Sequence, residues 1–317
     1  MTRTYCLVVN PAAGGGRARR LLPVVSGVLD AAGASYHVCE SASLGHAKDL
    51  AAEAARRGEV VVAFGGDGMV GALAGTVAAA GGVFGIIPSG RGNDFARTLD
   101  LPFAPAEAAR VLAEGRERPV DLIGVGRDPA GSGPADGESP GAAGRRELTV
   151  AGSVYLGIPA VAAEIAARSR VPPGEMAYPA AALRAVIGWR TTTFRLQLDG
   201  AAAQEFAGGA VVVANSRYFG AGMMVAPQAD VSDGLLDIVY ISGGSKIAMI
   251  RGLAKIKTGG HLSMSQIGTG RAAAVTVTAG RAVPGGADGE SLPSARPLDP
   301  GAVLRIRALP GILQVIC

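Results

Sequence analysis

Residues 60–71 have the sequence Val-Val-Val-Ala-Phe-Gly-Gly-Asp-Gly-Met-Val-Gly, in which an apolar run stops at three glycines that surround Asp67. A β-branched run bounded by glycine predicts a strand buried on both faces. The residues from Met69 to Ala80 are small and apolar without alternation, which favours a buried helix. The glycines therefore lie on a strand-to-helix turn at the carboxyl end of a sheet strand, where open α/β sheets bind ligands.

This glycine turn has the properties of a phosphate-binding loop. Glycine allows positive φ and leaves no Cβ to block a close approach, and the N–H groups at the start of a helix attract phosphate. Asp67 is an anion in that setting, so it needs a metal ion or a substrate proton for compensation. The alternative is that Asp67 only caps the helix, and the turn alone favours that alternative.

Composition sets limits on the class of protein. The chain has 317 residues, of which 49% are hydrophobic and 18% charged, so we expect a globular protein with room for two domains. A net charge of +4 permits attraction to anionic nucleotides or membrane surfaces without requiring either. Aromatic residues make up only 4% and no nucleic-acid motif is present, so we expect no nucleic-acid partner.

Cysteine usage and hydropathy predict a cytoplasmic protein. Cys6, Cys39 and Cys317 are widely spaced in the sequence, and their spacing indicates no zinc or disulfide framework. The most apolar long stretch, residues 151–167, contains Pro159 and Glu164. We therefore expect no membrane-spanning helix, and any membrane contact should be peripheral, at the inner face.

Strands and helices alternate through the first 121 residues, which predicts a parallel α/β sheet. Besides the central strand, the expected strands are Tyr5–Val9, Ser35–Cys39, Val83–Pro88 and Pro119–Val125, and the expected helices are Leu21–Ala32, Gly45–Arg57 and Ala104–Glu114. The first strand ends in a turn at residues 10–16, which either holds phosphate or is a flexible loop. A second glycine-rich loop, Ser89–Arg97, opens another helix, and its Asp94 makes the pair of loops a stronger signal than either alone.

The second half has a different pattern and predicts a β-rich domain, with the boundary near Asp121. Expected strands are Leu148–Val154, Thr192–Leu198, Ala210–Ala214, Leu236–Ile241, Ala273–Thr278 and Val303–Arg307, and expected helices are Ile158–Arg168, Ala180–Trp189 and Lys246–Lys257. A site is expected in the cleft between the two domains.

Carboxylates gather at two turns of this second domain. Asp230, Asp233 and Asp237 surround one turn. Either two of these carboxylates and a loop carbonyl bind a hard cation such as Mg²⁺, or the segment is an ordinary Asx turn before a strand. Asp288 and Glu290 lie at a second turn, which is either a simple hairpin tip or a carboxylate pair. If that tip reaches Asp67, the acids would suit Mg²⁺-assisted phosphoryl transfer.

Other chemistry-bearing residues give weaker signals. His46 and His261 lack an obvious nucleophile or metal partner, so surface or capping roles are favoured over catalysis. Met223, Met224 and Val225 are more typical of a core than of a lipid pocket. No Gly-x-Ser-x-Gly elbow and no Gly-x-x-x-x-Gly-Lys-Ser/Thr loop occurs, which argues against a hydrolase elbow and an ordinary P-loop kinase.

Taken in order, these motifs resemble the diacylglycerol kinase catalytic family, which includes bacterial lipid kinases and sphingosine and ceramide kinases, with NAD kinases as distant relatives. The resemblance covers segments 10–14, 65–68, 85–97, 215–237, 260–261 and 288–290. It implies an N-terminal Rossmann-like α/β nucleotide domain at 1–121, with 309–317 packing back on it. It also implies a C-terminal β-sandwich-like lipid domain at 122–308.

The resemblance also implies roles for individual residues. ATP-binding segments match Asn10, Pro11, Ala12, Ala13, Gly14, Ser41, Gly65, Gly66, Asp67, Gly68, Met69, Val70, Gly71 and Arg91. A Mg²⁺ site matches Asp230, Asp233 and the Leu235 carbonyl. Glu290 matches the proton acceptor, with Asp288 and Asp67 close to the chemistry.

Three departures from the family pattern affect the predicted function. Met69, Gly71 and Ala72 stand where the family has Thr and Asn or Asn-Glu, Arg91 replaces a Thr, and an Asn expected near Gly152 is missing. Arg91 could supply a phosphate contact instead.

The primary interpretation is an ATP-dependent lipid kinase that acts on diacylglycerol or a related amphiphilic alcohol. The alternatives are a kinase of a non-lipid hydroxyl compound and a catalytically silent nucleotide- or lipid-binding protein. The oligomeric state is open, and a homodimer is one alternative.

Overall fold

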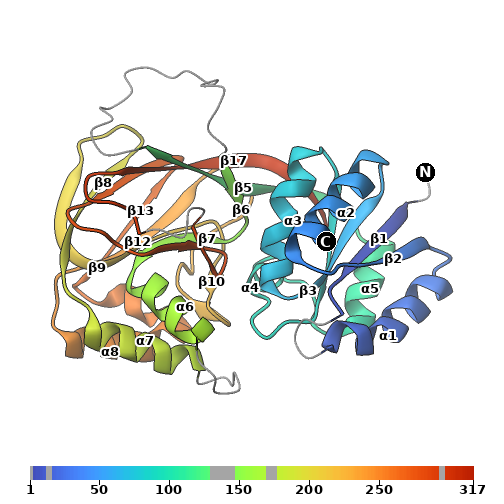
Figure 1. Ribbon diagram of the computed structural model, residues 1–317, viewed down its shortest axis with the longest axis horizontal. Coiled ribbons are helices and arrows are strands. Elements are labelled where there is room, and N and C mark those ends of the chain that lie inside the picture. The colour runs from blue at the N-terminus through green and yellow to red at the C-terminus, as the bar shows by residue number, and fades with distance from the viewer. Residues whose placement is uncertain (1–2, 12–15, 129–146, 169–176, 293–296) are drawn as a thin grey trace. The chain divides into compact units, whose positions relative to one another are not determined.

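The computed structural model describes residues 3–11, 16–128, 147–168, 177–292 and 297–317. It divides into two compact units (Figure 1). The N-terminal unit contains Met1–Leu122, Val231–Asp233 and Leu309–Cys317, and the C-terminal unit contains Ile123–Asp230 and Gly234–Ala308. The residues 12–14 of the expected nucleotide segment lie outside the described residues.

The N-terminal unit is built on a parallel sheet with the strand order β17-β4-β3-β1-β2. Its strands are β1 (Thr4–Val9), β2 (Ser35–Glu40), β3 (Val60–Gly65), β4 (Val83–Pro88) and the end of β17 (Val303–Ile316). Its helices are α1 (Arg17–Ala31), α2 (Leu44–Arg56), α3 (Asp67–Ala79), α4 (Asp94–Thr98) and α5 (Pro105–Glu114). All six residues of β3 are buried, as expected for a strand covered on both faces.

Alternate residues of these strands face two helical layers. Tyr5, Leu7 and Val9 of β1 form one core with α1 and α5. The opposite face of β1 and β3 lies against α2, which packs beside α3. Helix α2 begins at Leu44 because the Ser43 hydroxyl accepts a hydrogen bond from the His46 N–H at 3.1 Å.

The C-terminal unit is mostly antiparallel, with the strand order β16-β15-β7-β9-β8-β14-β17 and with β12 joining β9 to β13. Its strands are β6 (Leu148–Val150), β7 (Ser153–Gly157), β8 (Thr192–Leu198), β9 (Gln204–Ala214), β10 (Tyr218–Phe219), β11 (Met223–Met224), β12 (Leu236–Ser242), β13 (Ile267–Ala272), β14 (Ala274–Ala279), β15 (Gly285–Ala287) and β16 (Glu290–Ser291). The helices are α6 (Ile158–Arg168), α7 (Ala177–Gly188) and α8 (Lys246–Lys255), followed by the 3₁₀ turns η2 (Ile256–Thr258) and η3 (Gly260–Ser263).

Two strands run through the boundary between the units. Strand β5 (Glu117–Asp128) pairs with β6, and β17 pairs with β14 in its first part and with β4 near its end. The Asp121 carboxylate accepts a hydrogen bond from the Gly311 N–H at 2.7 Å, which ties β5 to the last part of β17 within the N-terminal unit. The expected two-domain α/β architecture with a β-rich second domain is confirmed.

The structure corrects several local expectations. The strand expected at Leu148–Val154 is broken at Ala151-Gly152 into β6 and β7. Strand β9 begins at Gln204 rather than at Ala210, and β17 continues to Ile316 rather than ending at Arg307. The sulfurs of Cys6 and Cys39, which are widely spaced in the sequence, lie 3.1 Å apart.

Among the described residues, every helix is too short or too polar to cross a lipid bilayer.

Candidate active site

The two glycine loops of the N-terminal unit lie in backbone contact. A Cβ atom on Gly66 would lie 2.9 Å from the Cα of Gly90, and one on Gly90 would lie 2.5 Å from the Cα of Gly66. A Cβ on Gly65 would lie 2.7 Å from the Cβ of Met69. Strands β3 and β4 are parallel neighbours, so the turns after them meet at the carboxyl edge of the sheet. Glycine is required here because the two loops pack against each other.

The Asp67 carboxylate joins these loops. Its Oδ2 accepts a hydrogen bond from the Asn93 N–H at 2.9 Å, and its Oδ1 accepts one from the Asp94 N–H at 2.5 Å. Asp67 therefore caps α4 rather than its own helix, whose N-cap Gly66 has no side chain. Burial raises the pKa of Asp67, while the two N–H donors and Arg97 act in the opposite direction. A raised pKa makes a carboxylate a better proton acceptor, which keeps catalytic chemistry open to Asp67.

Asn93 holds the second loop in shape and is a residue that the sequence analysis did not select. Its backbone is left-handed, with φ of 50°. Its side-chain oxygen accepts a hydrogen bond from the Gly90 N–H at 2.9 Å, and its amide nitrogen donates to the Gly90 carbonyl at 3.1 Å. The signal was present in the sequence, since asparagine tolerates left-handed backbone and pairs with nearby main chain.

We expect Gly90→Ala to lower the free energy of unfolding by about 1–3 kcal/mol, because the new methyl group would overlap the Gly66 main chain. Gly68→Ala is the matched control. A Cβ at position 68 meets nothing within 4 Å, and alanine should stabilise α3 by up to about 1 kcal/mol. Urea denaturation of both variants measures the difference, and equal midpoints would contradict the proposed packing of the two loops.

The other expected nucleotide-binding residues have different environments. Asn10 and Pro11 follow β1 directly. Ser41 is buried, and its hydroxyl donates to the Val9 carbonyl at 3.2 Å, so it ties the end of β2 to the end of β1. The side chains of Met69 and Val70 are buried in the core, which leaves only their backbone for a ligand.

The remaining residues of this set lie around the two loops. Arg91 is exposed on the second loop. Arg17, at the start of α1, donates a long hydrogen bond of 3.4 Å to the Gly90 carbonyl. The described part of the N-terminal unit therefore brings Gly65, Gly66, Asp67 and the Gly90 loop together. Nucleotide binding by this set stays a prediction.

In the C-terminal unit, the Asp288 carboxylate anchors the break between β6 and β7. It accepts hydrogen bonds from the N–H groups of Ala151, Gly152 and Ser153 at 2.7, 2.8 and 3.1 Å. Asp288 and Gly289 both have positive φ, 47° and 88°, which forms the two-residue turn of the β15–β16 hairpin. The hairpin tip proposed from the sequence is therefore present, and Asp288 has a structural role in it.

Asn215 reaches the same loop from β9. It is fully buried, and its side-chain amide donates to the Ala151 carbonyl at 2.9 Å. The backbone N–H of Asn215 and that of Ser216 both donate to the Gly152 carbonyl. The loop at Gly152 is thus held from two sides, by the hairpin and by the end of β9.

Glu290 begins β16, and its backbone pairs with Ala287 across the hairpin. Its side chain lies outside the described part of the structure. Because Asp67 belongs to the other unit, the convergence of Asp67, Asp288 and Glu290 stays a prediction.

The expected metal ligands lie on the segment that crosses between the units, with Asp230 and Leu235 in one unit and Asp233 in the other. Asp230 and Asp233 are exposed, and Leu235 is half-buried. The third carboxylate of that turn, Asp237, is buried opposite Arg271 on β13, with Oδ2 3.6 Å from the guanidinium. The Mg²⁺ site at Asp230, Asp233 and Leu235 stays a prediction.

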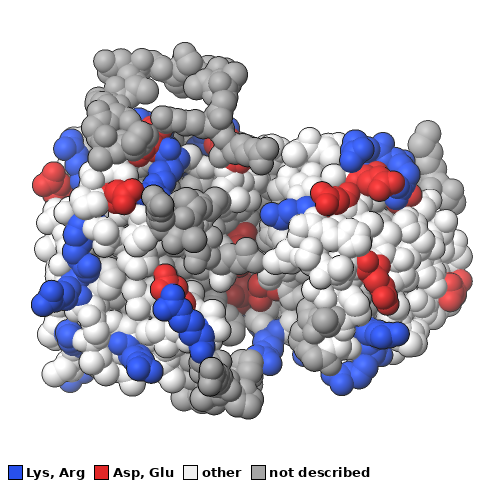
Figure 2. Space-filling model, in the orientation of Figure 1, with Lys and Arg blue, Asp and Glu red and all other residues white. Residues whose placement is uncertain are grey.

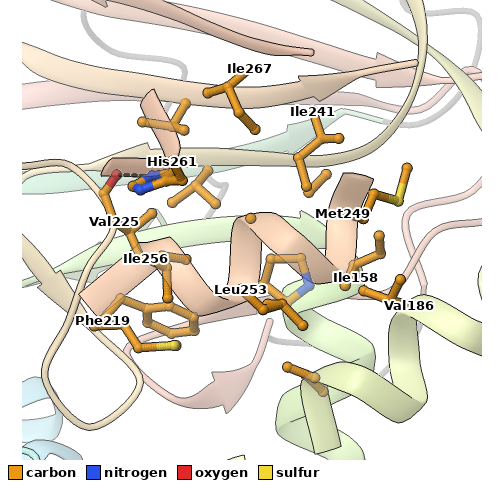
Figure 3. Close-up of a pocket in the computed structure, with 18 of the residues that line it drawn as sticks. Ile158, Val186, Phe219, Val225, Ile241, Met249, Leu253, Ile256, His261 and Ile267 are labelled. Atoms are coloured by element: carbon orange, nitrogen blue, oxygen red, sulfur yellow. Dashed lines mark hydrogen bonds between the residues drawn. The ribbon is translucent and has the colours of Figure 1, made fainter. Parts of the chain in front are cut away.

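An apolar cavity lies inside the C-terminal unit, between α6, α7, α8 and the sheet (Figure 3). Its volume is about 90 Å³, which is several times what one water molecule needs. Its wall is almost wholly hydrocarbon, contributed by residues such as Ile158, Val186, Phe219, Ile241, Met249 and Leu253. A cavity of this kind excludes water and accepts an apolar group.

Met223 and Val225 are buried, as expected for core residues, and they also line the cavity. The cavity corrects one expectation. His261, expected at the surface or at a cap, is buried in its wall and donates from Nε2 to the Val225 carbonyl at 3.0 Å. Burial lowers the pKa of His261, so it is neutral at pH 7. The capping role expected for His46 is confirmed, because its Nδ1 accepts from the Ala42 N–H at 3.2 Å.

Family models match both halves of the chain. Residues 4–125 match the diacylglycerol kinase catalytic domain, and residues 152–317 match the YegS C-terminal NAD kinase beta sandwich-like domain. The two matches cover the N-terminal sheet with its glycine loops and the β-rich unit with its cavity.

Individual relatives agree with these matches. The chain is 33% identical to a diacylglycerol kinase of Mycobacterium tuberculosis (strain H37Rv) over 231 residues, which are 72% of this chain and 69% of the relative. It is 25% identical to a diacylglycerol kinase of Bacillus subtilis (strain 168) over 266 residues, 82% of this chain and 81% of the relative. A crystal structure of a diacylglycerol kinase from Bacillus anthracis str. Sterne shares the fold, with a TM-score of 0.70 at 21% identity over 99% of this chain and 96% of that one. The chain belongs to the diacylglycerol kinase catalytic-domain family, in the branch that carries a YegS-type C-terminal domain.

Proposed function

We propose that this protein is an ATP-dependent lipid kinase that transfers the γ-phosphoryl group to a hydroxyl of diacylglycerol or a related lipid. Membership of a kinase family implies a phosphotransferase that uses a nucleotide. The observation that carries the lipid acceptor is the cavity, whose wall offers hydrocarbon to an acyl chain and almost no polar group to a soluble alcohol.

In this proposal the glycine loops hold the nucleotide. Their main-chain N–H groups approach the phosphates because no Cβ intervenes. Arg91 lies on the second loop and Arg17 beside it, so both are cations within reach of the phosphate oxygens in this proposal. Asp230, Asp233 and the Leu235 carbonyl offer the oxygen donors that Mg²⁺ prefers, and Mg²⁺ would neutralise phosphate charge there.

The acceptor chemistry is assigned to Glu290. Its carboxylate takes the proton from the lipid hydroxyl while the hydroxyl oxygen attacks the γ-phosphorus, and ADP leaves with the bonding electrons. Asp288 fixes the hairpin on which Glu290 lies. Asp67 shapes the nucleotide loops through its bonds to Asn93 and Asp94.

The experiment is a phosphoryl-transfer assay with γ-labelled ATP and Mg²⁺, run in parallel with diacylglycerol in mixed micelles and with soluble alcohols. Label transfer to the lipid alone supports the proposal. Transfer only to soluble alcohols would indicate a non-lipid kinase. Absence of transfer together with tight nucleotide binding would indicate a silent binding protein, which the buried apolar side chains of Met69 and Val70 would then explain.

Filling the cavity should impair use of long-chain lipids. Ala248 is half-buried on α8 and lines the cavity, so phenylalanine at this position would occupy space needed by an acyl chain. We expect Ala248→Phe to lower kcat/KM about tenfold or more for long-chain substrates. A loss of this size corresponds to the binding free energy of one to two buried methylene groups. Short-chain substrates should be less affected. Ala180→Phe, at an exposed position of α7, is the control, and an identical loss for both chain lengths would contradict the assignment.

Two of the helices that line the cavity, α7 and α8, also carry apolar side chains on their outer surface. Leu183 and Ile187 of α7 and Ile247 and Ile250 of α8 are exposed, Ile247 to 63%. Both helices also carry basic residues, Arg184 on α7 and Lys246 and Arg251 on α8; Figure 2 shows where lysines and arginines lie on one face of the molecule. Apolar residues ringed by cations suit the interface of an anionic membrane, so we include peripheral membrane contact through α7 and α8 in the proposal.

Introducing negative charge into the apolar part of this surface tests the contact. We expect Ile187→Asp combined with Ile247→Asp to weaken binding to vesicles that contain anionic phospholipid by about tenfold or more, because each isoleucine contributes roughly 1.5–3 kcal/mol when buried. Vesicle sedimentation measures this. Val24→Asp, at an exposed site on α1 of the other unit, should bind as the wild type does. Equal binding of the double variant would rule out this surface.

A further inference from the structure

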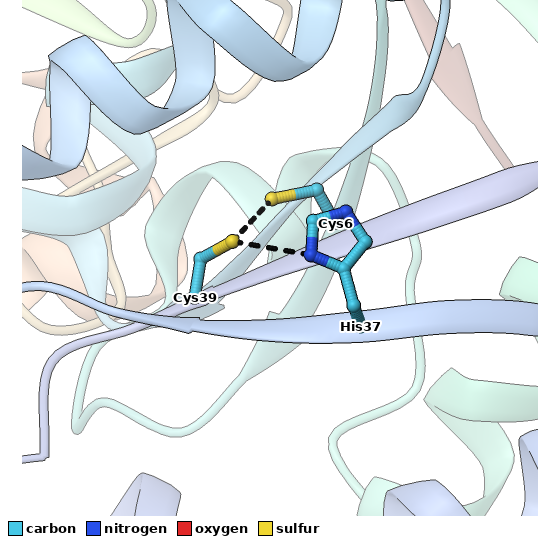
Figure 4. A group of neighbouring side chains, drawn as sticks. All are labelled: Cys6, His37 and Cys39. Atoms are coloured by element: carbon cyan, nitrogen blue, oxygen red, sulfur yellow. Dashed lines mark hydrogen bonds between the residues drawn. The ribbon is translucent and has the colours of Figure 1, made fainter.

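Three potential metal ligands meet at the edge of the N-terminal sheet (Figure 4). Cys6, His37 and Cys39 place one ligand atom each within 4.8 Å of one another. The two sulfurs are 3.1 Å apart, and the Cys39 sulfur lies 3.4 Å from Nδ1 of His37. The cluster shares no residue with the glycine loops or with the cavity.

The sheet itself creates this cluster. Strand β2 pairs in parallel with β1, and Cys6 lies opposite His37 in the register. His37 and Cys39 are two residues apart on β2, so their side chains point to the same face. Strand β2 is the last strand on this side of the sheet. Cys6 and Cys39 are 33 positions apart in the sequence, so the sequence alone does not indicate their contact. The pairing of β1 with β2 brings the two side chains together.

The orientation of His37 is fixed from the other side of the ring. Its Nε2 lies 3.0 Å from a carboxylate oxygen of Glu59, which is itself held by Arg57 at 2.9 and 3.1 Å. A carboxylate accepts, so Nε2 carries the proton and the unprotonated Nδ1 faces the cysteines. A carboxylate that binds the outer nitrogen of a histidine is the usual support of a metal-bound imidazole, because it fixes the tautomer and raises the basicity of the ligand nitrogen.

We propose that Cys6, His37 and Cys39 bind one thiophilic transition-metal ion, with Zn²⁺ as the best match, and that Glu59 is the positioning residue of this site. Two thiolates and an imidazole are the donors that select Zn²⁺ over hard cations. Tetrahedral Zn²⁺ with these bond lengths separates two sulfurs by about 3.8 Å and a sulfur from a nitrogen by about 3.6 Å. The observed sulfur–sulfur distance of 3.1 Å and sulfur–nitrogen distance of 3.4 Å are each within about 1 Å of these values.

The surroundings match a three-ligand site with a fourth position for water. Cys6 is fully buried, whereas the His37 side chain is 43% exposed, so one side of the cluster faces solvent. A bound ion would join the edge strand β2 to β1 through side chains in addition to the backbone ladder. The expected consequence is a stabilised sheet edge, since a ligand that binds only the folded state raises its stability.

A disulfide is the competing outcome for the same two cysteines. The sulfurs are farther apart than the roughly 2.05 Å of a disulfide, and a disulfide would make no use of His37 and Glu59. Both cysteines are free thiols in the structure. The cluster therefore favours the metal.

The test uses the whole protein, purified with reductant, stripped with chelator and titrated with Zn²⁺ against a chromophoric competitor. We expect one equivalent of Zn²⁺ per chain, and Co²⁺ in its place should give a thiolate-to-metal charge-transfer band. Cys39→Ser and His37→Gln should each weaken Zn²⁺ binding by at least about a hundredfold, and Glu59→Gln should weaken it by about tenfold. Zn²⁺ should also raise the melting temperature of the wild type.

Cys317→Ser is the matched control, because Cys317 is the third free cysteine and does not belong to the cluster. It should bind Zn²⁺ like the wild type. His37→Gln and Cys39→Ser change residues that are not fully buried, and circular dichroism of the metal-free variants checks that they fold. Failure of the wild type to bind Zn²⁺, unchanged affinity in both ligand variants, or a Cys6–Cys39 disulfide in the protein isolated under reductant would each overturn the proposal.

Discussion

Glu290→Gln is expected to lower kcat for phosphoryl transfer to lipid by about 10²–10⁴, the range that a positioned general base contributes. Glutamine keeps the size of the side chain and the backbone pairing with Ala287, but it cannot accept the hydroxyl proton. Affinity for ATP should stay the same, because the nucleotide loops belong to the other unit. Steady-state kinetics with saturating ATP, together with a separate nucleotide-binding titration, measure both quantities.

The amide variants of the other two acids, Asp67 and Asp288, test which of the three acids accepts the proton. Asp67→Asn and Asp288→Asn each keep the side-chain volume while removing the charge. Loss of turnover in Glu290→Gln with intact nucleotide binding assigns the proton acceptor. Loss confined to Asp67→Asn, with nucleotide binding intact, would move that role to Asp67, whose pKa burial already raises. Full activity in all three variants would exclude this mechanism.

Asp288→Ala should lower the free energy of unfolding by about 3–4 kcal/mol, the largest effect on stability that we expect from any single site. The carboxylate accepts three main-chain hydrogen bonds, and hydrogen bonds to a charged group contribute about 1.5–3 kcal/mol each without adding fully. Alanine would also have to adopt the left-handed backbone at φ 47°. Urea denaturation monitored by circular dichroism gives the value.

Two companions separate charge from backbone strain at this position. Asp288→Asn tolerates the left-handed turn and keeps one acceptor oxygen, so about half of the loss is expected. Asp299→Ala removes an exposed aspartate that pairs with Arg127 at the surface, and it should change stability by less than about 0.5 kcal/mol. If Asp288→Ala proved as stable as Asp299→Ala, the anchoring role of Asp288 would be wrong.

Local patterns in the sequence were sufficient to predict most strands of the N-terminal unit and most helices of the chain. The apolar run at 60–65 and the helix at 158–168 form as expected, because burial and periodicity are properties of consecutive residues. The break at Ala151-Gly152 was not predictable in this way. It depends on a carboxylate 136 residues away from Gly152, and no window of neighbouring residues contains it.

Pairing between distant strands explains the other misses. The Pro310-Gly311 pair indicates a strand end, yet β17 continues to Ile316 because its last residues pair with β4. The start of β9 at Gln204 and Glu205 is polar and exposed, so it has no hydrophobic signal, and its pairing with β8 defines it. In the candidate site, the acids and glycines were selected as candidates from their residue types, whereas the Gly66–Gly90 contact and the Cys6–His37–Cys39 cluster needed the register of the sheet.

Strand β17 pairs with β14 of the C-terminal unit and with β4 of the N-terminal unit, and this has a consequence for biosynthesis. Gln314 and Val315 cover the outer edge of β4, but a ribosome makes them only after the whole of residues 123–308. While the nascent chain lengthens, β4 therefore presents unpaired N–H and C=O groups, a template for pairing with other polypeptides. The N-terminal unit cannot complete its sheet as its own residues emerge, and its vulnerable interval lasts until translation reaches the final strand.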